Sequence, residues 1–99
     1  MTTTEDDTRI TESSGNVFVD LGFDAAEAEV MKLRTEVMIR TAQQLKAHGW
    51  TQVEAARRLG ITQPRVSRLI KGKVEDFSLD MLLTLATRAG LRTELRLSS

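Results

Sequence analysis

The chain has 99 residues, of which 40% are hydrophobic, and its 14 basic residues balance 14 acidic ones. This length suits one small domain with a modest hydrophobic core. The chain has no cysteine, which excludes disulfides, a thiolate metal site and a cysteine nucleophile. Because no apolar run approaches the roughly 20 residues of a membrane span, we expect a cytoplasmic protein that does not associate with membranes.

The neutral total hides a separation of charge along the chain. Residues 1–29 carry eight acids against one base, whereas residues 40–73 carry eight bases against one acid. We expect residues 1–15 to form a disordered acidic tail, because they hold too few apolar side chains to offset the entropy lost on ordering. Whether these acids also mimic phosphate and shield the basic region, or meet a basic partner, remains open.

After this tail, a short extended segment closed by Gly22 is predicted by the alternation of Val17, Val19 and Leu21 with Phe18 and Asp20. Asp24 is suited to cap a following helix. An apolar stripe then continues to Gly49, and residues 24–48 are expected to form one long helix or two. The stripe consists of Ala28, Met31, Val37, Met38, Ala42 and Leu45.

The most informative segment is residues 51–71, where the pattern predicts two short helices joined by a tight turn. Gly60 lies where the first helix should stop, and glycine adopts the left-handed conformation of such a stop without a Cβ penalty. Thr62 is suited to cap the second helix by accepting from the Arg65 amide, because Pro64 has no amide hydrogen. We assign the contact between the two helices to Ala56, Gly60, Val66 and Leu69.

The second helix interleaves polar and basic side chains with the inward residues Val66, Leu69 and Ile70. Arginine can bind guanine, glutamine can bind adenine, and serine suits several base edges in the major groove of DNA. We therefore predict base contacts by Gln63, Arg65, Ser67 and Arg68, and phosphate contacts by Gln52, Thr62, Lys71 and Lys73. The alternative is a structural hairpin with a solvated basic face, but a surface made for solubility mixes charges of both signs.

Ser78 is suited to cap a further helix, which we expect to end at Gly90. Residues 91–99 then alternate apolar and charged side chains, a pattern typical of a strand. In a domain otherwise made of helices, the natural partner is the same strand of a second copy, so we expect a homodimer paired through Arg92, Thr93, Glu94, Leu95, Arg96 and Leu97. Pairing within the chain, with residues 17–21, is the alternative and would leave a monomer.

Residues 35–90 resemble the Xre-like regulators, whose helix-turn-helix is that of Cro and the lambda repressor. Residues 16–97 also resemble small antitoxins of the HigA type, through the lead segment Asn16–Gly22 and the sequence Glu-Asp-Phe-Ser-Leu at residues 75–79. The resemblance implies an all-α, lambda-repressor-like domain over residues 16–90 that ends in a dimerisation strand. It further implies either an autoregulating antitoxin, encoded beside a RelE-like or HigB-like toxin, or a plain repressor.

The expected function is sequence-specific regulation of transcription, by binding of a homodimer to a palindromic operator in double-stranded DNA. The alternative is an interaction module that neutralises a toxin without strong DNA binding, for which a groove around Met31 and Met38 would serve if these residues are not core. We expect no enzymatic activity, cofactor or metal site, because the sequence has no nucleophile elbow, phosphate-binding glycine loop or cluster of metal ligands.

Overall fold

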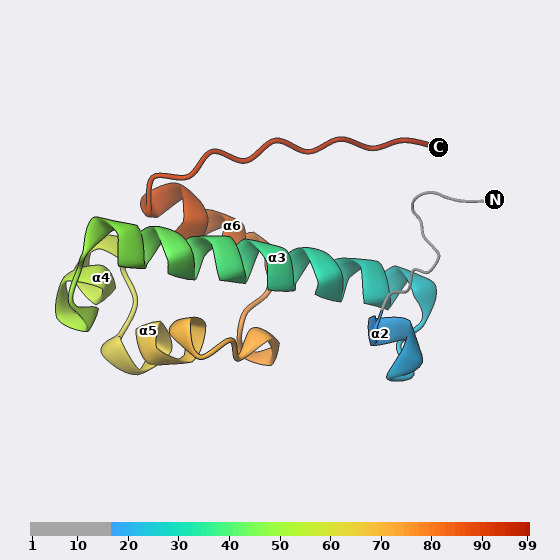
Figure 1. The fold of residues 1–99 in the computed structure, drawn as a ribbon, viewed down its shortest axis with the longest axis horizontal. Helices are drawn as coiled ribbons and strands as arrows, with labels where there is room; N and C mark the ends of the chain where they lie inside the picture. The colour runs from blue at the N-terminus through green and yellow to red at the C-terminus, as the bar shows by residue number, and fades with distance from the viewer. Residues whose placement is uncertain (1–16) are drawn as a thin grey trace. The chain divides into compact units, whose positions relative to one another are not determined.

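The computed structural model describes residues 17–99, and this part of the chain folds into helices joined by short turns (Figure 1). The predicted acidic tail at residues 1–15 lies outside the described residues. The chain divides into two compact units, residues 1–33 and 34–99. Its elements, in order, are α2 (Val17–Asp20), α3 (Ala25–His48), α4 (Gln52–Leu59), α5 (Gln63–Ile70), the 3₁₀ helix η1 (Val74–Asp76) and α6 (Leu79–Arg88).

The prediction of an extended segment over residues 17–21 is wrong, because this segment forms the helical turn α2. The Leu21 amide donates to the Val17 carbonyl over 3.1 Å, and the Phe23 amide donates to the Phe18 carbonyl over the same distance. The rings of Phe18 and Phe23 then meet edge to face, with centroids 6.0 Å apart. This aromatic contact requires the chain to turn back, and an alternation of so few residues cannot distinguish a strand from one turn of helix.

One uninterrupted helix of 24 residues, α3, forms where the sequence allowed one or two. The predicted cap is confirmed, since Asp24 Oδ1 accepts from the Glu27 amide over 2.8 Å. Glu27 returns the bond by accepting from the Asp24 amide over 3.2 Å, so the two residues form a reciprocal capping box. Met31 and Met38 are buried, as their interpretation as core residues requires, together with Ala28, Thr41 and Leu45.

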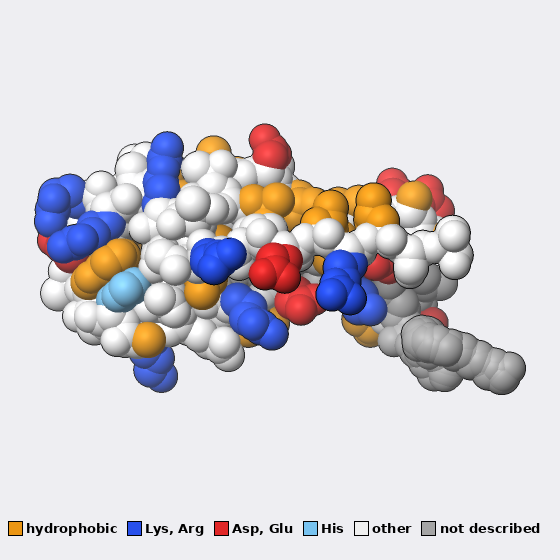
Figure 2. Space-filling model, turned by 90° about the horizontal axis from the view of Figure 1, so that it is seen from above, with side chains coloured by type: hydrophobic (Ala, Val, Ile, Leu, Met, Phe, Trp, Pro, Cys, Tyr) orange, Lys and Arg blue, Asp and Glu red, His pale blue; other side chains and the backbone are white. Residues whose placement is uncertain are grey.

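The hydrophobic core of residues 34–99 is built from side chains of α3, α4, α5 and α6, together with Phe77 before α6 and Ala89 after it. Burying one such leucine or phenylalanine side chain contributes about 1.5–3 kcal/mol. Trp50 packs against this core and stacks on the ring of His48, with centroids 4.1 Å apart. The imidazole, pale blue in Figure 2, lies beside hydrophobic surface. The core consists of Met38, Leu45, Ala55, Leu59, Val66, Leu69, Phe77, Leu82, Leu85 and Ala89.

Long polar side chains tie these helices together through backbone carbonyls. Arg34 of α3 donates from Nη2 to the Val74 carbonyl over 2.8 Å and from Nε to the Phe77 carbonyl over 2.8 Å, which fixes η1 to α3. Arg88 of α6 donates from Nη1 to the carbonyl of Leu59, at the end of α4, over 2.8 Å. A cation at the carbonyl end of a helix is favoured by the helix dipole, so this bond stabilises the end of α4.

The cap of α6 is confirmed, because Ser78 Oγ accepts from the Met81 amide over 3.2 Å. Residues 91–99 then run on outside any helix or strand (Figure 1). The predicted strand is therefore not formed by the single chain, and the alternative of pairing with residues 17–21 is wrong because those residues are helical. A strand needs a hydrogen-bonded neighbour, and none lies beside this segment among residues 17–99. Pairing with a second copy stays a prediction.

No helix in residues 17–99 combines the length and the apolar character that crossing a membrane requires.

Candidate nucleic-acid interface

The turn between α4 and α5 has the predicted left-handed stop at Gly60, whose φ is 72°. The Gly60 amide donates to the Ala56 carbonyl over 2.9 Å, and the Ile61 amide donates to the same oxygen over 3.1 Å. This doubly accepting carbonyl closes the end of α4 and turns the chain within three residues. At the other end of α4, Thr51 Oγ1 accepts from the Glu54 amide over 3.1 Å.

Thr62 caps α5 in the predicted way. Its Oγ1 accepts from the amide of Arg65 over 3.4 Å, and Pro64 occupies the first turn of the helix, where an amide hydrogen has no intrahelical partner. A hydroxyl keeps its own hydrogen when it accepts a bond, so the Thr62 side chain can cap the helix and still donate to a phosphate.

The inward face of the motif is largely as predicted. Val66 and Leu69 of α5 have no exposed surface, and Ala56 of α4 packs against the core while staying half-buried. Ala55 and Leu59 are the most deeply buried residues of α4, and neither was predicted to form the contact between the helices. Their spacing of four residues places both on one face of the helix and was the available signal.

Ile70 was predicted to face inward, and this prediction is wrong because 48% of its surface is exposed. It is the last residue of α5, where the helix has passed the edge of the core. Successive helical residues are rotated by about 100° about the axis, and this rotation takes Ile70 away from the core that Leu69 enters.

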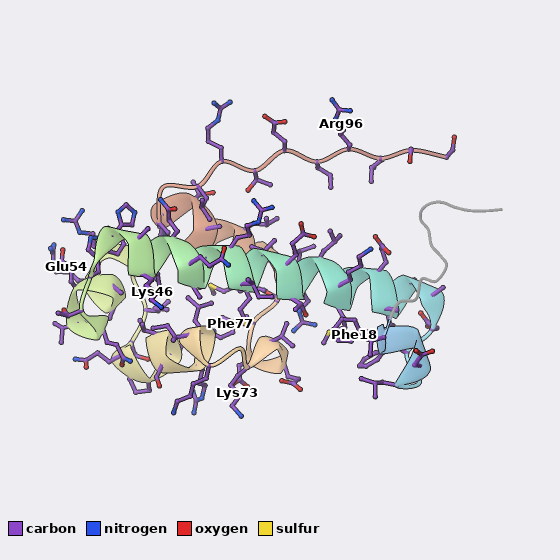
Figure 3. The ribbon with its side chains drawn as sticks, in the orientation of Figure 1. Phe18, Lys46, Glu54, Lys73, Phe77 and Arg96 are labelled. Carbon is purple, nitrogen blue, oxygen red and sulfur yellow. The ribbon has the colours of Figure 1, made fainter. Side chains whose placement is uncertain are left out.

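The side chains predicted to contact DNA lie on the outer surface of α4, α5 and the turn that follows α5. Of the four predicted base contacts, Gln63 and Arg68 are exposed, and Arg65 and Ser67 are half-buried. Figure 3 shows Lys73 projecting from the segment after α5, on the side away from α3. The residues predicted to bind phosphate are all exposed, namely Gln52, Thr62, Lys71 and Lys73.

The two arginines of α5 make contacts at the end of η1 that the sequence pattern does not indicate. The guanidinium of Arg65 lies 4.7 Å from the centre of the Phe77 ring, and its Nη2 donates to the Asp76 carbonyl over 3.3 Å. Arg68 forms an ion pair with the same residue, with 3.5 Å between Arg68 Nε and Asp76 Oδ2. Phe77 is buried, and Figure 3 shows its side chain between α5 and α3. Both arginines therefore meet the end of η1.

The single acid within residues 40–73, Glu54, is neutralised inside α4. Its Oε2 accepts from Arg57 Nη2 over 2.5 Å and from Arg58 Nε over 2.6 Å. Hydrogen bonds from Arg57 and then Arg58 lower the pKa of Glu54, and the bond to Glu54 raises the pKa of Arg57. The guanidinium of Arg58 also lies 5.0 Å from the centre of the Trp50 ring. These contacts pair the acid with bases of its own helix, and α5 itself carries no acid.

The arrangement of α4, a left-handed turn and a basic α5 defines the class of helix-turn-helix proteins. A family described as a helix-turn-helix domain matches residues 17–98, and the chain belongs to this family. A search of curated proteins finds no match. Because the helix-turn-helix is a DNA-binding motif, the class is that of DNA-binding regulators.

Proposed function

We propose that the protein is a cytoplasmic transcriptional repressor that binds a palindromic operator in its own promoter as a homodimer. The observation that carries the proposal is the division of α5 into two faces. Val66 and Leu69 are wholly buried, whereas Gln63 and Arg68 are exposed on a helix without a single acid. An outer face of this composition complements the polyanionic groove of DNA.

In the proposed complex, α5 lies in the major groove. Arg65 and Arg68 bind guanine acceptors and Gln63 binds adenine, each good bidentate pair contributing about 1–3 kcal/mol of discrimination. Lys71 and Lys73 meet phosphates at the groove edge. Gln52 begins α4, where the helix dipole and the amides of the first turn favour a phosphate. These contacts fix the register in which α5 reads the bases.

The homodimer is proposed because one recognition helix reads only a few base pairs, whereas two on a two-fold axis read half-sites about 34 Å apart. Residues 91–99 supply the proposed contact. Leu95 and Leu97 have 69% and 88% of their surface exposed in the single chain. Antiparallel pairing with a second copy would cover these leucines and bring Arg92 or Arg96 of one copy close to Glu94 of the other.

A second role, neutralisation of a RelE-like or HigB-like toxin, rests on the resemblance to HigA-type antitoxins and on the surface of residues 17–33. This unit exposes Val17, Leu21 and Val30. The same unit exposes the acids Asp20, Asp24, Glu27 and Glu29. A segment that exposes both apolar and acidic side chains fits a basic protein partner. As a repressor, the protein would act by occupying the promoter, which excludes the polymerase.

The proposal is tested by fluorescence-anisotropy titration of the purified protein against its own upstream promoter fragment and a scrambled fragment, at several salt concentrations. We expect preference for the promoter by about a thousandfold or more, with affinity falling steeply as salt rises. Arg65→Ala and Arg68→Ala should relax base preference, whereas Lys73→Ala should weaken binding to both fragments alike and reduce the salt slope.

Equal losses of base preference in all three variants would remove the assignment of α5 to the groove. Absence of binding at low salt would overturn the repressor and favour the interaction module. Copurification with the product of an adjacent reading frame would distinguish an antitoxin from a repressor that acts alone.

A further inference from the structure

The side chain of Asp76, the last residue of η1, faces α5, the proposed recognition helix. Its Oδ2 lies 3.5 Å from Arg68 Nε, and 44% of its side-chain surface remains exposed, against 54% for Arg68. An ion pair this exposed contributes little to stability. The ion pair can instead act in two other ways. It fixes the position of the Arg68 side chain, and it places a negative charge beside the proposed DNA-binding face of α5.

The position of Asp76 is set by contacts on the far side of η1. Arg34 of α3 donates to the carbonyls of Val74 and Phe77, which flank Asp76 along the chain. The Phe77 side chain is buried, with 1% of its surface exposed. The backbone of η1 is therefore held by α3 and by the core, so the Asp76 carboxylate is presented to Arg68 from a fixed support.

The two arginines of α5 depend on Asp76 in different ways. Arg65 contacts the Asp76 carbonyl and the Phe77 ring, and both contacts would survive a change of the Asp76 side chain. Arg68 contacts the carboxylate itself. Removing the carboxylate therefore changes the surroundings of Arg68 while it leaves the partners of Arg65 in place.

We infer that Asp76 is a specificity-determining residue of the DNA interface, which positions Arg68 for base recognition; this inference rests on the proposed DNA-binding function. A guanidinium has five N–H donors, and a carboxylate at Nε leaves the terminal nitrogens to form two parallel bonds to guanine O6 and N7. The same negative charge repels phosphate, so it opposes capture of Arg68 by the backbone of DNA of any sequence. Asp76 thus favours base contacts over phosphate contacts.

The neighbouring acid provides a matched control. Glu75 lies in the same turn of η1 and is also exposed, but within residues 17–99 its side chain makes no ion pair with α5. Asp76→Asn and Glu75→Gln remove the same charge from adjacent positions. Any general effect of charge on DNA affinity should therefore appear in both variants, whereas loss of the contact with Arg68 should appear only in Asp76→Asn.

The experiment measures binding to the promoter fragment and to the scrambled fragment for the full chain and for Asp76→Asn, Glu75→Gln, Arg68→Ala and the double variant Asp76→Asn with Arg68→Ala. We expect Asp76→Asn to bind scrambled DNA more tightly and to lose about tenfold of the preference for the promoter, the scale of one base contact. Glu75→Gln should strengthen binding to both fragments by the same factor and keep the preference. In the Arg68→Ala background, Asp76→Asn should leave the preference unchanged, because the residue through which it acts is absent.

Partial unfolding of a variant would lower both affinities alike and leave their ratio intact, so a structural effect cannot imitate the expected result. A preference in Asp76→Asn equal to that of Glu75→Gln would overturn this inference and leave the proposed function standing. An equal loss of preference in the Arg68→Ala background would also overturn it. If the unchanged protein did not discriminate between the fragments, the proposed function would fail together with the inference.

Discussion

The helix-turn-helix segment, residues 51–71, and the C-terminal segment, residues 91–99, both carry clear sequence patterns, yet only the first forms its predicted structure in the single chain. Residues 51–71 bury Ala55, Leu59, Val66 and Leu69 in a core shared with α3 and α6 of the same chain. In residues 91–99, Leu95 and Leu97 have no such partner among the described residues and stay exposed. A pattern specifies a structure where the chain itself provides the surface that the pattern needs.

Caps show the same contrast at the level of single bonds. Thr51 and Thr62 each accept a hydrogen bond from an amide three residues ahead in the chain. Such bonds are local, so the sequence is enough to place them. A strand in residues 91–99 would need backbone partners from elsewhere, and residues 17–90 place none beside it.

The largest effect should come from truncating one leucine in each region. Leu69→Ala removes a wholly buried side chain, and we expect the free energy of unfolding to fall by about 2–5 kcal/mol. Leu97→Ala removes a side chain that is 88% exposed, and in dilute solution it should change this free energy by less than about 0.5 kcal/mol. Urea denaturation followed by circular dichroism measures both. Similar losses in the two variants would mean that residues 91–99 are packed in the monomer.

Truncation after Gly90 tests the second region directly. If residues 91–99 join two copies, the truncated protein should sediment as a monomer. Specific DNA complexes favour their operator over other DNA by roughly 4–10 kcal/mol, and a monomer should lose about half of this free energy. The affinity for the operator should therefore fall by about thirtyfold or more. The segment carries two bases and one acid, so Lys46→Gln in the full chain is the control, because it removes the same net charge from an exposed residue outside the segment. Unchanged affinity of the truncated protein, with the control binding normally, would refute dimerisation through this segment.

The sequence predicted most of the helical domain, because its signals are local. The stop at Gly60, the caps at Thr62 and Ser78 and the burial of Val66 and Leu69 all follow from spacings of a few residues. The helical turn α2 was missed because it depends on the contact between Phe18 and Phe23, which an alternating pattern does not reveal.

The surroundings of the candidate site were harder to predict than its residues. The types and positions of Gln63, Arg65 and Arg68 follow from the motif, but their partners do not. The contact of Arg34 with the Phe77 carbonyl spans 43 residues, and no local pattern indicates it. The short helix η1 brings Asp76 beside α5 only because α3 holds it there. Partners of this kind are determined by tertiary packing, and neither periodicity nor capping residues indicate contacts between segments distant in sequence.

The smallest expected effect is a pH dependence of stability that differs between the two regions. Hydrogen bonds from Arg57 and Arg58 lower the pKa of Glu54 below its usual range. A carboxylate whose pKa is lower in the folded than in the unfolded state contributes stability above its ordinary titration range, and this contribution is lost as pH falls through the lowered pKa. Glu54→Gln should therefore be less stable than the unchanged protein at neutral pH and should approach it in acid.

The matched control is Glu94→Gln, which removes the same charge from residues 91–99, where no ion pair is formed within the described chain. Thermal unfolding in buffers from neutral pH to below the ordinary titration range of glutamate measures the effect, which should shrink in 1 M salt because exposed ion pairs are screened. If Glu54→Gln and Glu94→Gln changed the pH dependence of thermal stability equally, the hydrogen bonds from Arg57 and Arg58 to Glu54 would make no measurable contribution to stability. A change of pH dependence seen only in Glu54→Gln would show that the pairing of Glu54 with Arg57 and Arg58 stabilises the helix-turn-helix. Like the caps, this is an interaction between residues close in sequence, for which the chain supplies its own partners.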